Sequence, residues 1–254
     1  MRLFDSHAHY GDGRFDADRE EVLASMKAAG VERIVEIGCD LPGAQNAVRL
    51  AHAHPFLYAA VGVHPQEAGG ASDADFDALE ALCRDEKVVA VGEIGLDYHY
   101  ENAPRAVQKE VFARQLELAR RLDLPVCIHD REAHADTLDV IRAFPGVRGV
   151  FHSYSGSLEM TRDVLRLGFI FGFNGIITFK NAKKFEPIIK SLPEASILLE
   201  TDCPYLAPEP FRGRRNDSRW LYRACETVAE LRGIPDEDAA ELTYANAARF
   251  YGLS

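Results

Sequence analysis

Short apolar runs rich in β-branched residues alternate along the chain with longer amphipathic stretches. Such runs predict strands, and apolar positions that recur every three to four residues predict helices. The first strand is expected over residues 2–7 and the first helix over 16–29, where Gly30 ends it. The same order continues, with strands at 31–38, 56–63, 88–94, 125–129, 147–152, 169–174 and 197–200 and helices at 43–54, 72–84, 104–122, 133–144, 157–167, 183–191, 218–231 and 236–250.

This alternation predicts the fold class. Eight strand–helix units at intervals of roughly 25–40 residues are typical of an α/β protein with a (β/α)8 TIM barrel. A doubly wound sheet usually has fewer strands and a glycine-rich phosphate loop after the first, whereas the first strand here ends in His7-Ala8-His9. No linker interrupts the pattern. We therefore expect a single domain over residues 1–254, with 236–250 as an extra C-terminal helix.

The composition narrows the class of protein. Hydrophobic residues make up 47% of the 254 positions and are spread evenly, which provides for a large core and argues against disorder. The formal net charge of −11 repels polyanions at long range, so a protein that coats DNA non-specifically is disfavoured, although a local basic patch is compatible with it.

The cysteines and the apolar segments indicate the compartment. The five cysteines form no CxxC motif and no disulfide framework, which predicts reduced thiols. The N-terminus lacks the apolar stretch of a signal peptide, and no window approaches the roughly 20 apolar residues that span a bilayer. We expect a cytoplasmic protein with no membrane contact and no obligate protein partner.

Histidines and carboxylates gather at the expected strand ends, where barrel enzymes carry their sites. These residues are His7, His9, His64, Glu93, His129, His152 and Asp202. His7 and His9 are two apart on a strand, so both point to the same side. Imidazoles with carboxylates suit Zn²⁺, Mn²⁺ or a similar divalent ion. Five or six such ligands favour two ions that share one carboxylate.

No single member of this set carries the inference, because each also has an ordinary structural interpretation. His52-Ala53-His54 has the spacing of His7-Ala8-His9 but falls at a helix end, and we interpret that pair as solvated surface residues or as partners of the charge at the helix C-terminus. His134, near a helix start, is also interpreted as a surface residue. His99 lies in a loop from which it could reach a substrate, and its role stays open.

Basic residues follow the last two expected strands, where this fold commonly binds phosphate. They are Lys180, Lys183, Lys184 and Lys190 after the seventh strand and Arg212, Arg214, Arg215 and Arg219 after the eighth. Arg131, two residues beyond His129, adds a further possible anion contact. The alternative interpretation is a solvated surface. On a chain of net charge −11, such a cluster favours a local phosphate site.

Several ordered motifs resemble those of the TatD-family metal-dependent deoxyribonucleases, over essentially the whole chain. The motifs are Asp5-Ser6-His7-Ala8-His9, Gly92–Tyr98, Ile128–Arg131, His152–Ser157, Gly172–Gly175 and Glu200–Pro208. Two positions depart from the commonest family pattern. Gln66 stands where a histidine often follows the proline, and Cys203 stands where serine or alanine is frequent. Neither is a ligand position, so the departures bear on substrate preference.

The resemblance implies an amidohydrolase-like barrel with two divalent ions per subunit, Mg²⁺, Mn²⁺ or Zn²⁺. It implies that Glu93 bridges the two ions, and it assigns His7, His9 and Asp202 to one ion and His129 and His152 to the other. It places His64 near the substrate phosphate. Asp202 and Glu93 would be the catalytic residues, with Asp202 orienting the attacking water and taking its proton. A cysteine nucleophile at Cys203 is disfavoured, because it has no dedicated base.

Residues and resemblance together predict a metal-dependent hydrolase that cleaves DNA phosphodiesters, as an exonuclease on single-stranded or frayed 3′ ends. Lys180, Arg131, Arg214, Arg215 and His64 are the expected substrate contacts. An alternative enzyme would use the same metals on a different ester or amide, such as an aminoacyl-tRNA ester or a cyclic amide. A binding scaffold with structural metals is a third reading, but structural zinc prefers closed thiolate sites.

Overall fold

The computed structural model describes residues 1–253 and contains every expected strand. The strands are β1 (Leu3–Ala8), β2 (Val31–Gly38), β3 (Leu57–Val61), β4 (Val88–Asp97), β5 (Val126–Arg131), β6 (Gly149–Phe151), β7 (Ile170–Phe173) and β8 (Ile197–Leu199). They form one sheet in the order β1 to β8, and the pairs β3–β4, β4–β5, β5–β6 and β7–β8 are parallel. A helix follows each strand along the chain, so the expected (β/α)8 TIM-barrel class is confirmed.

The helices also follow the expected order. They are α1 (Arg19–Ala24), α2 (Leu41–Ala53), α3 (Asp73–Leu82), α4 (Arg105–Leu122), α5 (His134–Arg142), α6 (Leu158–Arg166), α7 (Phe185–Ser191), α8 (Leu221–Arg232) and α9 (Asp236–Phe250), the extra C-terminal helix. The helix expected over 16–29 is divided, because the Ser25 hydroxyl donates to the Val22 carbonyl at 2.6 Å and competes with continued helix. Gly30, with a φ of 78°, ends this region as expected.

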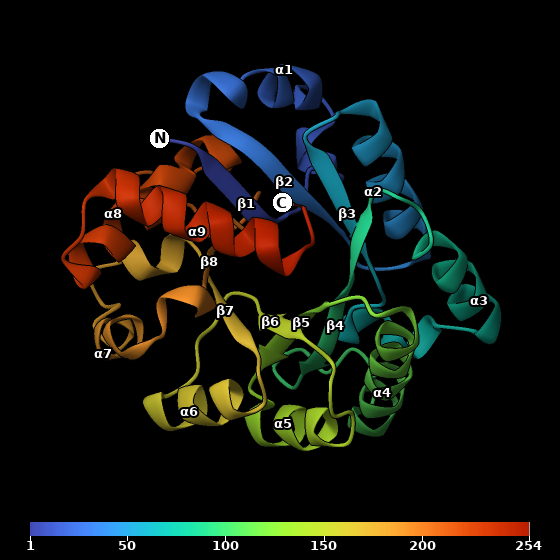
Figure 1. Ribbon diagram of the computed structural model, residues 1–254. Helices are drawn as coiled ribbons and strands as arrows, with labels where there is room; N and C mark the ends of the chain where they lie inside the picture. The colour runs from blue at the N-terminus through green and yellow to red at the C-terminus, as the bar shows by residue number, and fades with distance from the viewer. Residues whose placement is uncertain (254) are drawn as a thin grey trace. The chain divides into compact units, whose positions relative to one another are not determined.

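The chain divides into two compact units. The first contains residues 1–35, 153–161 and the chain from 170 onward, and the second contains 36–152 and 162–169. Within the first unit, α8 and α9 lie side by side, and α9 packs against β1 and β8 (Figure 1). Within the second unit, α4 packs against β4 and α2 against β3. The expected single domain over 1–254 stays a prediction.

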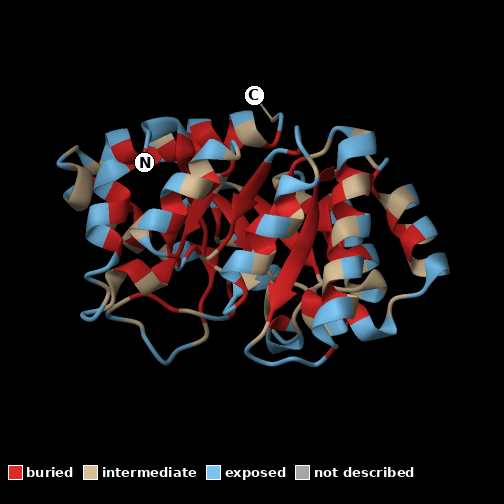
Figure 2. Ribbon diagram, turned by 90° about the horizontal axis from the view of Figure 1, so that it is seen from below, coloured by how far each residue is buried: buried red, intermediate tan, exposed pale blue. Residues whose placement is uncertain are grey.

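The strands are buried along most of their length, whereas the helices alternate between buried and exposed residues (Figure 2). All ten residues of β4 and all six of β1 are buried. Parallel strands with both faces covered are normally filled by apolar side chains, so buried carboxylates and imidazoles on these strands require polar partners. Among residues 1–253, no helix is long and apolar enough to cross a membrane.

Candidate metal centre

His7, His9 and Asp202 come together where β1 and β8 end. His7 is the next-to-last residue of β1, His9 directly follows β1, and Asp202 lies in the segment after β8. His7 Nε2 is 3.2 Å from His9 Nε2 and 3.8 Å from Asp202 Oδ1, and the same Asp202 oxygen is 3.3 Å from His9 Nε2. We call these three residues the β1 triad.

Asp5 joins β1 to the segment after β8. Its carboxylate accepts hydrogen bonds from the backbone N–H groups of His7 at 3.3 Å and Thr201 at 2.9 Å. It also accepts from the hydroxyl groups of Thr201 at 2.5 Å and Ser218 at 2.6 Å. Burial raises the pKa of Asp5 to about 7, against the opposing effect of the bonds from Ser218 and Thr201. Asp5 thereby fixes the backbone from which His7 and Asp202 project.

Glu93 lies among three histidines in the second unit. Its Oε1 is 2.7 Å from His152 Nε2, 2.8 Å from His129 Nδ1 and 3.6 Å from His64 Nε2. Glu93 is on β4 and His129 on β5, while His152 directly follows β6 and His64 follows β3. Parallel pairing of β3, β4, β5 and β6 therefore delivers all four side chains to one place. We call them the Glu93 cluster.

The charges in the Glu93 cluster follow from burial and from these contacts. Burial alone would raise the pKa of Glu93, but the imidazoles of His152, His64 and His129 outweigh it and hold that pKa well below its ordinary value. Burial lowers the pKa of His64 to about 3, despite the nearby Glu93 carboxylate. Burial alone would lower the pKa of His129, but hydrogen bonds with Asp97 and Glu93 outweigh burial and raise that pKa. An ionised carboxylate therefore lies beside a neutral imidazole at His64, and these are the states that ligate a metal.

Both groups of residues fit a divalent ion. Two ligand atoms that each lie about 2.1 Å from one tetrahedral ion are about 3.4 Å apart. The ligand atoms of His7, His9 and Asp202 all lie within 4.8 Å of one another, and so do those of His64, Glu93 and His129. Nitrogen and carboxylate donors without a thiolate suit Zn²⁺, Mn²⁺ or a similar ion. The donor set therefore supports the use of a divalent metal.

Asp97 holds His129 from the side opposite Glu93, a role that the sequence reasoning missed. Asp97 Oδ2 is 3.2 Å from His129 Nε2, whereas Glu93 faces Nδ1. Gln66 Nε2 donates to the same Asp97 oxygen at 2.8 Å, and the backbone N–H groups of residues 99 and 100 donate to the other oxygen. The available signal was an acidic residue at the end of the strand that carries Glu93. Gln66, one of the two departures from the family pattern, thus contacts the residue that orients His129.

The loops after β7 and β8, which carry the basic residues, contact each other. Glu209 donates its backbone N–H to Thr178 Oγ1 at 2.8 Å, and the Arg212 guanidinium lies 4.4 Å from the centre of the Phe179 ring. The exposed basic residues of these loops include Lys180, Lys183, Lys184, Arg212 and Arg214.

Arg215 is paired with a carboxylate. Its guanidinium donates to both carboxylate oxygens of Asp18, at 2.8 and 2.6 Å, and to the backbone carbonyl of Arg14. These contacts give it a structural role. In the second unit, the Arg131 guanidinium lies over the ring of Tyr100, 4.8 Å from its centre. Substrate binding by Lys180, Arg131, Arg214 and Arg215 stays a prediction.

Other candidate residues have ordinary contacts. His52, His134 and His99 lie 2.8–3.0 Å from the carboxylates of Asp85, Asp130 and Glu132, respectively. All three histidines are exposed, as expected for His52 and His134, whereas His54, also expected at the surface, is half-buried. Cys203 is fully buried, in agreement with the interpretation that it is not a nucleophile.

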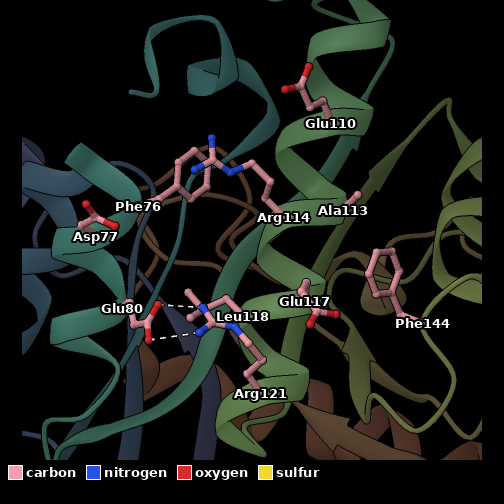
Figure 3. Close-up of a pocket in the computed structure, with 10 residues that line it drawn as sticks. All are labelled: Phe76, Asp77, Glu80, Glu110, Ala113, Arg114, Glu117, Leu118, Arg121 and Phe144. Atoms are coloured by element: carbon pink, nitrogen blue, oxygen red, sulfur yellow. Dashed lines mark hydrogen bonds and ion pairs between the residues drawn. The ribbon is translucent and has the colours of Figure 1, made fainter. Parts of the chain in front are cut away.

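A pocket of about 540 Å³ lies between α3 and α4 in the second unit (Figure 3). Its lining includes Glu80 and Arg121, which are paired at 2.7 Å, and Phe76, whose ring is covered by the Arg114 guanidinium at 3.7 Å. Two charged residues of the lining, Glu80 and Arg121, are thus paired with each other, and Arg114 pairs with Asp73 outside the lining. None of its lining residues belongs to the β1 triad or the Glu93 cluster.

Comparisons with known proteins point in one direction. Residues 4–252 match the family model described as TatD related DNase. The "Uncharacterized metal-dependent hydrolase YabD" of Bacillus subtilis is 41% identical over 99% of this chain and 100% of its own. The "3'-5' ssDNA/RNA exonuclease TatD" of Cronobacter sakazakii is 34% identical over 98% of this chain and 97% of its own.

Solved structures agree with this similarity. The crystal structure of YJJV, a TatD homologue from Escherichia coli K12, superposes with a TM-score of 0.93. It is 33% identical in sequence and covers 100% of this chain and 99% of its own.

Proposed function

The chain belongs to the TatD family of metal-dependent hydrolases, and from that premise we propose that it is a deoxyribonuclease that removes nucleotides from single-stranded or frayed 3′ ends. The observation that carries this proposal is the presence of two histidine–carboxylate groups that each fit a divalent ion. The basic loops after β7 and β8 support a phosphate-containing substrate. The exonuclease name of the Cronobacter sakazakii relative supports a nucleic acid.

We propose that His7, His9 and Asp202 hold one ion and that Glu93, His129 and His152 hold a second, because the ligand atoms of the latter three lie 2.7–3.4 Å from one another. A divalent ion held there would supply Lewis-acid stabilisation of the phosphoryl oxygen and would make the attacking water more acidic. Asp202 is the residue that accepts the proton of that water, because its carboxylate lies at the end of β8 with one oxygen directed at His9. His64 binds the substrate phosphate in this proposal.

Other residues of the chain orient the ligands or hold the substrate in place. Asp97 keeps the Nε2 proton of His129 and so leaves Nδ1 as the ligand atom. Asp5 fixes the spacing between His7 and the Asp202 turn. Lys180, Arg214 and Arg131 hold neighbouring phosphates and do not take part in proton transfer. No covalent intermediate with a protein side chain is needed.

The test uses single-stranded oligonucleotides labelled at either the 5′ or the 3′ end. We expect stepwise shortening from the 3′ end, loss of activity in EDTA, and recovery with Mg²⁺, Mn²⁺ or Zn²⁺. Glu93→Gln removes a ligand charge at the Glu93 cluster and is expected to abolish cleavage. Glu117→Gln, on the exposed surface of α4, is the matched control and is expected to leave the rate unchanged.

Three results would contradict the proposal. Equal cleavage with and without EDTA would exclude metal dependence, and wild-type rates in Glu93→Gln would exclude the site. Metal-dependent hydrolysis of an aminoacyl-tRNA ester or a cyclic amide, without cleavage of DNA, would favour the alternative enzyme.

A further inference from the structure

Two tyrosines are unusually exposed for large apolar side chains. Tyr100 is 55% exposed and Tyr205 is 44% exposed, and Met1 is the only other exposed large apolar side chain among residues 1–253. Tyr100 lies three residues after Asp97 in the sequence, and Tyr205 lies three residues after Asp202. An exposed ring gains nothing from the core, so its position beside a reaction site calls for an explanation.

Tyr205 is held beside the β1 triad by four contacts. Its backbone N–H donates to the Asp202 carbonyl at 3.0 Å, and its ring centre lies 6.2 Å from that of His9. The phenol donates to Asp12 at 3.2 Å, and the Arg14 guanidinium, which also donates to Asp12, lies 4.2 Å from the ring centre. The ring is therefore fixed in orientation while nearly half of the residue remains open to solvent.

Tyr100 has the same kind of setting in the second unit. Its backbone N–H donates at 3.0 Å to Asp97, the carboxylate that orients His129. The Arg131 guanidinium lies 4.8 Å from the centre of the Tyr100 ring, and the His99 ring meets that ring edge-on at 4.8 Å. Each unit thus carries one exposed tyrosine that is covered by an arginine and anchored to its own candidate ligand group.

An arginine over a ring is not by itself informative in this protein. Arg215 lies over Phe15 and Arg2 over Tyr244, but both of these rings are buried and the arginines cover the core. Tyr100 and Tyr205 differ because their rings are exposed and because they adjoin the metal-binding groups. An arginine–tyrosine pair with an open surface is the kind of platform on which unpaired bases stack.

We propose that Tyr205 with Arg14, and Tyr100 with Arg131, are two stacking sites for unpaired nucleobases of the substrate strand. This inference rests on the proposed function and names the part of the substrate, the base, that the metal ligands do not contact. Stacking accepts every base, so it confers a preference for single strands without a preference for sequence. A base in a duplex is already stacked and paired, and it must leave the helix before it can use either site.

The test is a comparison of binding to strands with and without bases. The probe is a fluorescein-labelled oligo(dT) with phosphorothioate linkages, chosen to resist cleavage, and a second strand carries abasic residues at single positions. Binding to the holoprotein in Mg²⁺ is followed by fluorescence anisotropy. We expect Tyr205→Leu and Tyr100→Leu each to weaken binding of oligo(dT) by about 5- to 30-fold. When the base that stacks on a given tyrosine is absent, the leucine variant is expected to cause no further loss.

Two further variants separate stacking from structure. Tyr205→Phe keeps the ring but removes the hydrogen bond to Asp12, and it is expected to bind oligo(dT) within about twofold of the wild type. Tyr222→Leu, on α8, removes a ring that also lies near an arginine, Arg223, and is expected to have no effect. Loss of binding in Tyr205→Phe equal to that in Tyr205→Leu would overturn the proposal, and so would equal losses on the abasic strand.

The outcome also separates this inference from the proposed function. Base-dependent binding by a protein that does not cleave unmodified DNA would leave the stacking sites in place and reject the nuclease activity. Metal-dependent cleavage with equal affinity for abasic and normal strands would reject the stacking sites alone.

Discussion

A histidine gives a metal only the ring nitrogen that carries no proton, so the group on its opposite nitrogen matters as much as the ligand itself. For His129 that group is Asp97, which is fully buried and receives hydrogen bonds at both oxygens. Every group directed at Asp97 is a donor: His129, Gln66 and two backbone N–H groups. Only an ionised carboxylate can satisfy all of them.

Asp97→Asn tests this arrangement with almost no change in volume. The two backbone N–H groups require the amide oxygen at the Oδ1 position, so the amide nitrogen must face His129 and Gln66. Gln66 can turn its own oxygen toward that group, but His129 must then move its proton to Nδ1, the atom directed at Glu93. We expect metal affinity, measured by competition titration, to fall by about 10- to 100-fold.

Asp136→Asn is the matched control for this variant. Asp136 also accepts a hydrogen bond from a neutral side chain, Tyr98, but lies away from the ligands on α5. We expect it to keep full metal affinity. A normal affinity in Asp97→Asn, with a circular dichroism spectrum like that of the wild type, would show that Asp97 does not set the proton position of His129.

The proposed ligands could be selected from the sequence more readily than the residues that support them. His7, Glu93 and His129 could be selected because each combines a metal-binding side chain with the end of an apolar run. Asp97 also has a metal-binding side chain and also lies at the end of an apolar run. Its proposed function, however, depends on the ring orientation of His129 and on the reach of the Gln66 side chain. Those are properties of side-chain packing, which residue spacing does not encode.

At the scale of secondary-structure elements, Asp5 links β1 to two segments that follow β8. Thr201 and Ser218 both donate to it, and Ser218 also accepts from the Tyr10 hydroxyl at 2.8 Å. These groups are buried, so each hydrogen bond replaces contacts that water would make in the unfolded chain. The link therefore contributes to stability as well as to the geometry of the β1 triad.

Asp5→Ala is expected to destabilise the fold by about 2–4 kcal/mol, because it leaves several buried donors without an acceptor. Ser218→Ala removes one donor and keeps the carboxylate, and we expect a loss of about 1 kcal/mol. Urea denaturation of both variants measures the two free energies of unfolding. Equal losses would mean that the Ser218 bond alone carries the link and that Asp5 does not unite the three segments.

The order of elements could be predicted because each strand and helix has its own local pattern. β2 and α9 have the expected boundaries, since Gly30 and Pro235 mark their starts. β4 continues three residues beyond its expected end at 94, because parallel pairing with β5 extends through Asp97 and Arg131. That extension could not be predicted, because it depends on a partner strand that is distant in the sequence.

At the scale of the whole molecule, bound metal should stabilise the fold, because folding assembles ligands from distant parts of the chain. A ligand at about 100 times its dissociation constant adds about 2.7 kcal/mol. For a protein of this size that corresponds to a rise in melting temperature of about 5–10 °C. We expect EDTA to lower the melting temperature by this amount at pH 7.5, and Zn²⁺ or Mn²⁺ to restore it.

The same experiment at lower pH tests the ligand type. Imidazoles bind metal only when neutral, so protons compete with the ion below the ordinary histidine pKa of about 6.5. The stabilisation by metal should therefore be present at pH 7.5 and largely lost at pH 5.5. A metal-induced rise that is the same at both values would argue against histidine ligands.

The balance of charge raises a separate question, because a chain of net charge −11 is expected to attract DNA poorly at long range. Attraction must then come from local cations, and the contact between the loops after β7 and β8 brings exposed ones together. Lys180 and Arg214 are exposed there, whereas Arg215 is tied to Asp18. Lys180 and Arg214 are therefore open to a phosphate, whereas the charge of Arg215 is already paired, although all three belong to the same basic sequence pattern.

Neutralising Lys180 and Arg214 together should flatten the salt dependence of the Michaelis constant for oligonucleotides. Each phosphate contact on a single strand contributes about 0.7 to the slope of log affinity against log salt, so the double glutamine variant should lose about 1.4. The turnover number should change less, because these groups position the strand and do not activate the water.

Lys190→Gln, which removes a cation already paired with Glu186 on α7, should leave the slope unchanged. Arg215→Gln should instead lower the melting temperature, because it breaks the pair with Asp18. A slope that falls with Arg215→Gln but not with the double variant would reverse these assignments and place the phosphate contact at Arg215.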